Sequence, residues 1–328
     1  MYFVPSIALR GIDSLIEQSG EDPARFFLDV GLSLDCLKQA DSRVSGQQFN
    51  DLMEHAARQL NQRFFGLQLA KIQGASILGP LWFLLRNSAT IREGIQNLLV
   101  NYPSHTEATF FATEETEHGT HFIYEVNPFI QDEHTQVIDL GLGISCLHFR
   151  RYIASNWQPK AVYFRASEPY EKRPLIEMFG PKLYFNQDQN SIFLTKQEVD
   201  LPIRGASKLQ RLYYAHELSK RKDLNPRSAV VQTENIILAS LTKHHCSLDF
   251  VAKCLNYKPR TLQYQLQQQG TSFQTLLQQA KLNLALRYLQ QSDLSITEVA
   301  QRLHFAETAV FTRFVKKLTG KTPRQHRV

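Results

Sequence analysis

Two stretches of twenty residues decide the fold, because the second repeats the pattern of the first. Residues 247–266 read SLDFVAKCLNYKPRTLQYQL, and residues 295–314, at an offset of 48, read SITEVAQRLHFAETAVFTRF. Each stretch predicts a short helix, a tight turn and a second helix. A small Ala lets the helices cross closely and larger apolar residues fill the wedge between them, which is typical of a helix-turn-helix. The matching pairs are Val251 and Val299, Ala252 and Ala300, Leu255 and Leu303, Tyr257 and Phe305, Leu262 and Val310, and Leu266 and Phe314.

A predicted helix from Phe273 to Leu289 joins the two units. At 1.5 Å per residue it spans very roughly 25 Å, while successive major-groove faces of B-DNA lie about 34 Å apart. One molecule could therefore place both second helices in adjacent major grooves on one side of a duplex. The alternative is an all-α bundle that has no role in binding DNA.

The positive charge of the chain is confined to the part that holds the repeat. Residues Leu224 to Val328 contain 14 Lys and Arg against 5 Asp and Glu, a net charge of +9, whereas Met1 to Asp223 carry a net charge of −3. A basic segment joined to a mildly acidic one suggests a polyanionic partner, and double-stranded DNA fits a helix-turn-helix. On charge alone, a solvated basic surface explains the asymmetry equally well.

Separated anchors agree in order and spacing with a known family. In the C-terminal part they are Pro259-Arg260-Thr261-Leu262-Gln263, Gly270-Thr271-Ser272-Phe273, Ala285-Leu286-Arg287-Tyr288-Leu289, Ile296-x-x-Val299-Ala300-x-x-Leu303-x-Phe305, Phe311-x-Arg313-Phe314 and Gly320-x-x-Pro323-Arg324. In the N-terminal part they are Asp41-x-Arg43-Val44, Gly79-Pro80-Leu81 and Asn186-Gln187-x-Gln189-Asn190-Ser191-Ile192.

From about Ser247 to Arg327 the chain closely resembles the DNA-binding domain of the AraC/XylS family of transcription regulators. The part before it is similar to the arabinose-binding-like domain of one branch of that family. The resemblance implies a sequence-specific transcription regulator, here expected to be an activator. It also implies a homodimer that contacts RNA polymerase and responds to a small-molecule effector.

Two departures from the family pattern concern the turns. The family usually has Gly at the corner of each helix-turn-helix, where a left-handed backbone costs nothing; here the residues are Asn256 and His304. The small polar cap before each second helix is replaced by Lys258 and by Ala306. Ser295 and its partner three residues on, Glu298, retain a capping box.

The exposed early turns of the two second helices hold the expected DNA contacts. Arginine pairs bidentately with guanine and glutamine with adenine, so Arg260 and Gln263 are the expected base readers. Lysines and arginines nearby are expected to contact the phosphate backbone, which anchors the protein without reading sequence. The expected contacts in the first helix-turn-helix are Arg260, Thr261, Gln263, Tyr264 and Gln267, and those in the second are Thr308, Ala309, Thr312 and Arg313. The expected contacts to the DNA backbone are Lys281, Lys316, Lys317, Lys321 and Arg324.

Residues 1–223 are predicted to form an α+β domain for effector sensing or dimerisation, and residues 224–328 an all-α DNA-binding domain with two helix-turn-helix units joined by a long helix. The boundary is placed at Asp223-Leu224-Asn225-Pro226, which breaks a helical pattern. Two β-branched and aromatic runs, Thr106 to Thr113 and Thr120 to Val126, predict an antiparallel hairpin. A long helix from about Glu133 to Ala154 follows, and then three short strands.

The hairpin and the long helix are expected to enclose a ligand pocket. Arg150, Arg151 and Lys160 would suit an acidic ligand, although a solvated helix end explains them equally well. Ordinary core packing is the alternative for the aromatic residues. The residues proposed for the pocket are Trp82, Tyr102, Phe110, Tyr124, His148 and Tyr152.

Other classes of protein fit less well. His244-His245-Cys246 with Cys254 lacks a second paired spacing, so neither a metal nor a cofactor is expected. No P-loop, Gly-x-Ser-x-Gly or His-Glu-x-x-His occurs, so no enzyme is expected. No apolar run reaches the ~20 residues of a membrane span and no signal peptide is evident, so the expected location is the cytoplasm. The remaining alternatives are a regulator whose N-terminal domain only dimerises and a ligand-processing enzyme fused to a DNA-binding module.

Overall fold

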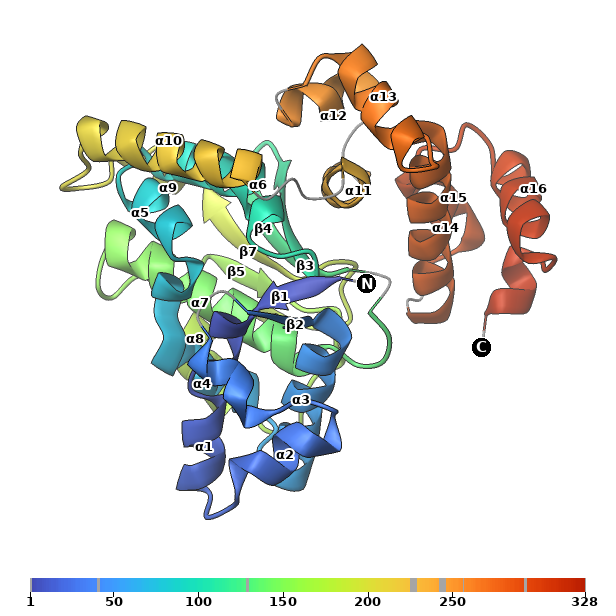
Figure 1. The fold of residues 1–328 in the computed structure, drawn as a ribbon. Helices are drawn as coiled ribbons and strands as arrows, with labels where there is room; N and C mark the ends of the chain where they lie inside the picture. Colours follow the sequence, from blue (N-terminus) through green and yellow to red (C-terminus); the bar gives the residue numbers. More distant parts are fainter. Residues whose placement is uncertain are drawn as a thin grey trace. The chain divides into compact units, whose positions relative to one another are not determined.

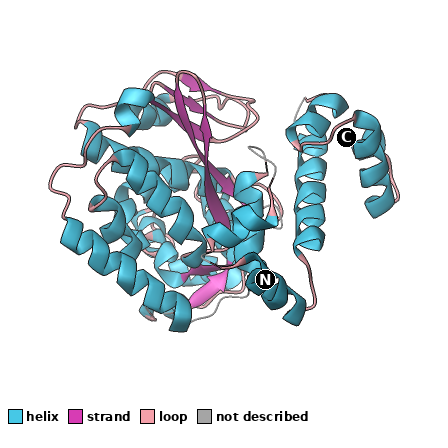
Figure 2. Cartoon of the chain, turned by 90° about the horizontal axis from the view of Figure 1, so that it is seen from above, coloured by secondary structure: helices cyan, strands magenta, loops and turns pink. Residues whose placement is uncertain are grey.

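The computed structural model describes residues 2–39, 42–127, 130–224, 229–241, 246–255, 257–291 and 294–327 (Figure 1). The chain divides into two compact units: unit 1 comprises Met1–Val126 and Ile130–Asn225, and unit 2 comprises Asn127–Phe129 and Pro226–Val328. Unit 1 contains strands and helices, and all regular elements in the described part of unit 2 are helices (Figure 2). The predicted fold class, α+β followed by all-α, is therefore confirmed.

A five-stranded sheet crosses unit 1 in the order β3-β4-β7-β5-β6. The predicted hairpin is present as β3 and β4, and its register places Phe111 opposite Tyr124. Strand β7 pairs antiparallel with β4 and β5, and β6 is parallel to β5. A separate two-stranded ribbon pairs β1 with β2. The strands are β1 (Phe3–Pro5), β2 (Arg43–Ser45), β3 (Thr109–Glu115), β4 (Gly119–Val126), β5 (Ala161–Tyr163), β6 (Leu183–Tyr184) and β7 (Ser191–Thr195).

The long predicted helix is α7 (Thr135–Ile153), which packs against α3, α4 and strand β4. It is apolar on most of its surface because it is buried on several sides, with Val137, Leu140 and Leu142 almost fully covered. The other helices of unit 1 are α1 (Ile12–Gln18), α2 (Pro23–Asp29), α3 (Gly46–Gln59), α4 (Phe65–Gln73), α5 (Pro80–Arg86), α6 (Ile91–Asn101), α8 (Arg173–Phe179), α9 (Lys196–Val199) and α10 (Lys208–Leu224), with 3-10 turns at Ser6–Leu9, Leu34–Lys38, Gly74–Leu78 and Tyr102–Ser104.

Two buried carboxyl groups make hydrogen bonds at the start of α7. The carboxylate of Asp139 accepts a hydrogen bond from the Arg63 guanidinium at 2.9 Å, and Glu54 accepts one from the backbone N–H of Gln136 at 2.8 Å. Burial raises the pKa of Asp139 to about 6, although Arg63 attracts its charged form. Burial also raises the pKa of Glu54, and the charge of Asp139 adds to that effect.

We expect Asp139 to make the stability of unit 1 depend on pH. Its folded-state pKa lies above the ordinary value, so the carboxyl stabilises the fold fully below about pH 4, and this contribution is lost as the pH rises through about 6. Replacing it with Asn, which resembles the protonated form, removes this dependence. The free energy of unfolding of Asp139→Asn should therefore rise relative to that of the unmodified protein, by about 2–3 kcal/mol, between pH 4 and pH 7.5. Denaturant unfolding across this range measures the difference, and a constant difference would contradict the expectation.

Unit 2 contains two copies of the predicted helix-turn-helix. The long helix α14 joins them and packs against α11 as well as against α15, α16 and the last 3-10 turn. The elements are α11 (Ala229–Ser240), α12 (Leu248–Cys254), α13 (Pro259–Gln268), α14 (Phe273–Gln291), α15 (Ile296–Arg302), α16 (Thr308–Thr319) and a 3-10 turn at Pro323–His326.

The two turns share the same backbone hydrogen bonds. The N–H of Tyr257 donates to the carbonyl of Ala252 at 2.8 Å, and the N–H of Phe305 donates to that of Ala300 at 2.9 Å. Both alanines are fully buried at the helix crossing. His304 adopts the left-handed conformation expected at the corner, with φ of 56°, and Asn256 lies outside the described residues. The repeat predicted at an offset of 48 therefore holds through the first helix and the first part of the turn, as far as Tyr257 and Phe305.

Candidate functional site

One face of α13 presents the side chains expected to read DNA. Leu262 and Leu266 are fully buried against the rest of unit 2. The residues between and beside them point outward because a helix turns by about 100° per residue. Pro259 occupies the first turn, where its missing N–H is tolerated. The expected contacts Arg260, Thr261, Gln263, Tyr264 and Gln267 are all exposed.

The second recognition helix, α16, is one residue out of register with the repeat. Its buried residues are Phe311 and Val315, whereas Val310 is 36% exposed and Phe314 is half-buried. The predicted core position of Val310 is therefore wrong, and Phe314 is only partly buried, with its ring centre 5.0 Å from that of Phe305. The physical reason is the turn: four residues separate α12 from α13, but five separate α15 from α16.

The added turn residue also moves the helix cap. The N-cap of α16 is Glu307, not Ala306, and its side chain caps no backbone N–H. At the N-terminus of α15 the predicted capping box of Ser295 and Glu298 is present. Glu307 lies at the positive end of the helix dipole, where a carboxylate is favoured.

The exposed face of α16 differs in chemistry from that of α13. Ala309 and Arg313 are exposed, and Thr308 and Thr312 are half-buried. The hydroxyl of Thr308 lies 3.3 Å from that of Thr297 in α15. The four cations expected to contact phosphates, all exposed, are Lys316, Lys317, Lys321 and Arg324.

Lys281 has a different environment from the other expected phosphate contacts. It lies on α14, half-buried, with its ammonium group 4.6 Å from the centre of the Phe305 ring. Burial lowers the pKa of this ammonium. The cation–π contact links the connecting helix to the turn of the second helix-turn-helix, so Lys281 supports that turn in the protein alone.

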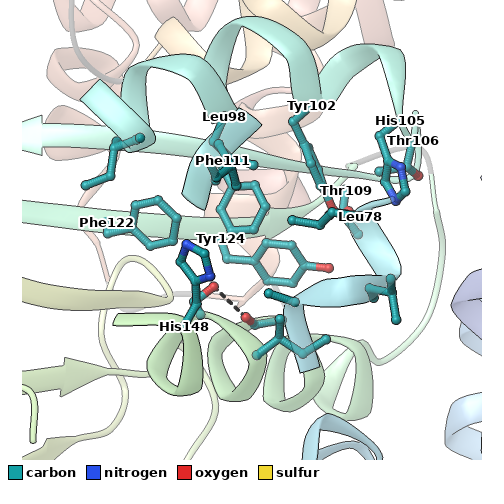
Figure 3. A pocket seen from close by; sticks show the side chains of 18 of the residues that line it. Leu78, Leu98, Tyr102, His105, Thr106, Thr109, Phe111, Phe122, Tyr124 and His148 are labelled. Atoms are coloured by element: carbon teal, nitrogen blue, oxygen red, sulfur yellow. Dashed lines mark hydrogen bonds between the residues drawn. The ribbon is translucent and has the colours of Figure 1, made fainter. Parts of the chain in front are cut away.

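Unit 1 encloses a cavity of about 100 Å³ between the β3–β4 hairpin, α6 and α7 (Figure 3). Four of the six predicted pocket residues line it: Tyr102, Tyr124, His148 and Tyr152. Its other walls are mainly apolar side chains of α6, α7 and the sheet, which were not among the predicted pocket residues: Ile91, Ile95, Leu98, Phe111, Phe122, Leu140, Ile144 and Phe149.

Phe110 and Trp82 do not line the cavity, so their assignment to the pocket is wrong. Neighbouring residues of a strand point to opposite faces, and Phe111 is the one that faces Tyr124. Trp82 lies on α5, half-buried, with the Arg86 guanidinium 5.1 Å from the centre of its ring. The hairpin register follows from the position of the turn, so the sequence was sufficient to predict that Phe111, not Phe110, faces the cavity.

The polar groups of the cavity gather at one side. The hydroxyls of Tyr102 and Thr109 are 2.8 Å apart, and Figure 3 shows the Tyr124 hydroxyl beside them. Burial raises the pKa of Tyr124 to about 12, so this phenol remains a neutral hydrogen-bonding group. Its ring lies flat on α7, where a Cβ on Gly141 would come within 2.0 Å of it.

His148 lies beside Phe122, away from the three hydroxyls (Figure 3). Its ring packs edge-on against Tyr152, with ring centres 4.9 Å apart. Burial, with a contribution from Arg151, lowers the pKa of His148 to about 4, so its imidazole is neutral near pH 7. Arg150 donates to the carbonyl of Trp157 at 3.0 Å and does not line the cavity.

The described residues hold no group of three or more His, Cys, Asp or Glu side chains that could bind a metal ion. His244 and His245, from the weak metal pattern, lie outside the described residues. In the same described part of the chain, no helix is long and apolar enough to cross a membrane.

Comparison with known proteins agrees with this architecture. Residues 20–203 match the arabinose-binding domain found at the N-terminus of AraC transcription regulators, and residues 251–328 match a helix-turn-helix domain family. The transcriptional regulator VirS of Mycobacterium tuberculosis is 26% identical over 97% of this chain and 94% of its own length. An ornithine utilization regulator of Pseudomonas aeruginosa is 21% identical over 99% and 96%.

Two further matches cover different parts of the chain. The urease operon transcriptional activator of Escherichia coli is 37% identical over 81 residues, which are 25% of this chain and 27% of that protein. The crystal structure of the regulator CdpR from Pseudomonas aeruginosa aligns with a TM-score of 0.42 and 17% identity, covering 83% of this chain and 91% of that one.

Proposed function

Because the chain belongs to the AraC family of transcription regulators, we propose that α13 and α16 enter successive major grooves of double-stranded DNA. In this proposal Arg260 and Gln263 read base edges, with Thr261, Tyr264 and Gln267 beside them. Residues 224–328 then form the DNA-binding domain and residues 1–223 the regulatory domain. In the second helix-turn-helix, the corresponding contacts to DNA are Thr308, Ala309, Thr312 and Arg313. Lys316, Lys317, Lys321 and Arg324 contact phosphates.

The face of α13 is the observation that carries the proposal. Its two leucines are buried, and five side chains able to contact DNA are exposed together on the opposite face. A helix that presents arginine and amide groups in this way suits the hydrogen-bonding edge of the major groove. The exposed cations at the end of α16 suit the phosphate backbone.

Replacing Arg260 with Ala tests base reading. We expect a loss of roughly 1–3 kcal/mol, about 5- to 150-fold in affinity, for the best site selected from random DNA, with relaxed preference at one base pair. Reselection with the variant identifies that base pair. Lys316→Ala is the matched control: it should weaken binding to all sequences alike and reduce the slope of log affinity against log salt by about one. Equal loss on all sequences for Arg260→Ala would exclude its role as a reader.

The regulatory part of the proposal concerns unit 1. A small-molecule effector in the cavity is supported by the apolar walls and the grouped hydroxyls, which are typical of ligand sites. We propose further that the protein is a homodimer acting in the cytoplasm as an activator in contact with RNA polymerase, without a catalytic step. A regulator whose N-terminal domain only dimerises is the second candidate, favoured if no molecule binds the cavity.

An ion pair offers a route from the cavity to the end of unit 1. Helix α6 turns Ile91, Ile95 and Leu98 toward the cavity. From the same helix, Glu93 accepts a hydrogen bond from Arg211 of α10 at 2.6 Å. Helix α10 is the last element of unit 1 before the DNA-binding part of the chain. We therefore propose that a ligand which displaces α6 acts on α10.

A further inference from the structure

The walls of the unit 1 cavity are uncharged. None of the described residues that line it is Asp, Glu, Lys or Arg. Of the charged residues next to lining residues in the sequence, Arg150 bonds the backbone carbonyls of Trp157 and Met178, and Asp139 pairs with Arg63. An ionised ligand group would lose its hydration here without a charged lining residue to pair with, which disfavours its burial.

Several polar groups of the cavity already have partners. Ser145 donates to the carbonyl of Gly141 at 2.7 Å, and Thr106 donates to that of Phe3 at 3.1 Å. A sugar carries a hydroxyl on most of its carbons, and each would need a partner when buried. The cavity therefore suits a ligand with few polar groups.

The cluster of Tyr102, Thr109 and Tyr124 has capacity for one such group. Each hydroxyl donates one hydrogen bond and can accept two. The Tyr102 and Thr109 hydroxyls share one hydrogen bond, so the Tyr124 hydroxyl beside them can offer its donor or its acceptor lone pairs to a guest. Beyond the cluster the wall is made of aromatic rings, with Phe111 4.8 Å from Tyr124 and 5.0 Å from Phe122 between ring centres.

We infer that the effector is an uncharged, mostly apolar small molecule whose single hydroxyl or carbonyl group meets the hydroxyl cluster of Tyr102, Thr109 and Tyr124. This inference rests on the proposed function, because it assigns a ligand class to the same regulatory site. It separates this chain from a sugar receptor, although its first domain matches an arabinose-binding family, and from a receptor for a charged amino acid. The neutral state of His148 is consistent with it.

Two matched series of small molecules test the ligand class on the full-length protein at pH 7.5. The first is toluene, benzyl alcohol and benzoate, and the second is octane, 1-octanol and octanoate; L-arabinose and L-ornithine complete the panel. Titration calorimetry should show binding of at least one alcohol. The matching carboxylate should bind at least about 100-fold more weakly, and the hydrocarbon about 2- to 13-fold more weakly because it lacks one hydrogen bond.

Variants then locate the site. Leu98→Trp fills the cavity and should abolish alcohol binding, whereas Val100→Trp, on the exposed side of the same helix, should not. Tyr124→Phe should remove most of the difference between alcohol and hydrocarbon. Tighter binding of L-arabinose, L-ornithine or a carboxylate than of the alcohols overturns the inference, as does failure of both alcohols to bind.

Selection of DNA sites with the same preparation separates this inference from the proposed function. Specific DNA binding without binding of either alcohol contradicts only the ligand class. Alcohol binding that Leu98→Trp abolishes, in a protein that selects no DNA sequence, supports the ligand class and contradicts the proposed function.

Discussion

Phe311→Ala is expected to destabilise the second helix-turn-helix by about 3–5 kcal/mol, the usual cost of removing a fully buried phenylalanine. Phe311 fills the wedge between α15 and α16. The centre of its ring lies 5.3 Å from the centre of the Phe305 ring in the turn. Hydrogen exchange in the full-length protein is the suitable measurement because it reports on each helix separately. Amides of α15 and α16 should lose protection, and specific DNA binding should fall with them.

Val310→Ala is the matched control, since Val310 is the neighbouring residue and was the predicted core position. Its side chain is more than one-third exposed, so the substitution should change protection by less than about 1 kcal/mol. If Val310→Ala reduced protection as much as Phe311→Ala, Val310 would be the buried residue, and α16 would follow the offset of 48 that the sequence repeat predicts. The pair therefore tests the added turn residue directly.

The sequence was sufficient to predict the helix-turn-helix units because their signals are local. The small Ala, the turn and the apolar residues follow one another within twenty positions, and even the left-handed corner at His304 could be predicted. The register of α16 could not be derived from the repeat. It depends on one residue in a turn, and Val310 and Phe311 are both apolar, so either could fill the wedge.

The cavity shows a different limit. Tyr102, Tyr124, His148 and Tyr152 could be identified as lining residues because the hairpin and the long helix that carry them have clear patterns. Phe110 was preferred over Phe111 because both are aromatic neighbours and only the strand pairing distinguishes them. The aliphatic wall from α6 was missed because a residue that lines a cavity looks like an ordinary core residue in sequence.

The close crossing of α4 and α7 was also outside the reach of sequence reasoning, and it provides the other large effect. Gly66→Ala is expected to destabilise unit 1 by at least about 3 kcal/mol. A Cβ at this position would lie 2.0 Å from the carbonyl oxygen of Gln136. The backbone there cannot easily retreat, because the Gln136 side chain bonds the N–H of Gly66 at 2.9 Å and the carbonyl of Arg63 at 2.9 Å.

Gly94→Ala is the control for glycine in a helix of the same unit. The nearest atom to a Cβ on Gly94 is 3.7 Å away, so alanine fits and should leave stability unchanged or raise it by up to about 1 kcal/mol. Denaturant unfolding and hydrogen exchange of α4 and α7 would measure both variants. Since α7 carries His148 and Tyr152 into the cavity, separation of the two helices by Gly66→Ala should also weaken binding of any cavity ligand. Equal stability of the two variants would mean that α4 and α7 do not cross as closely as their backbones indicate.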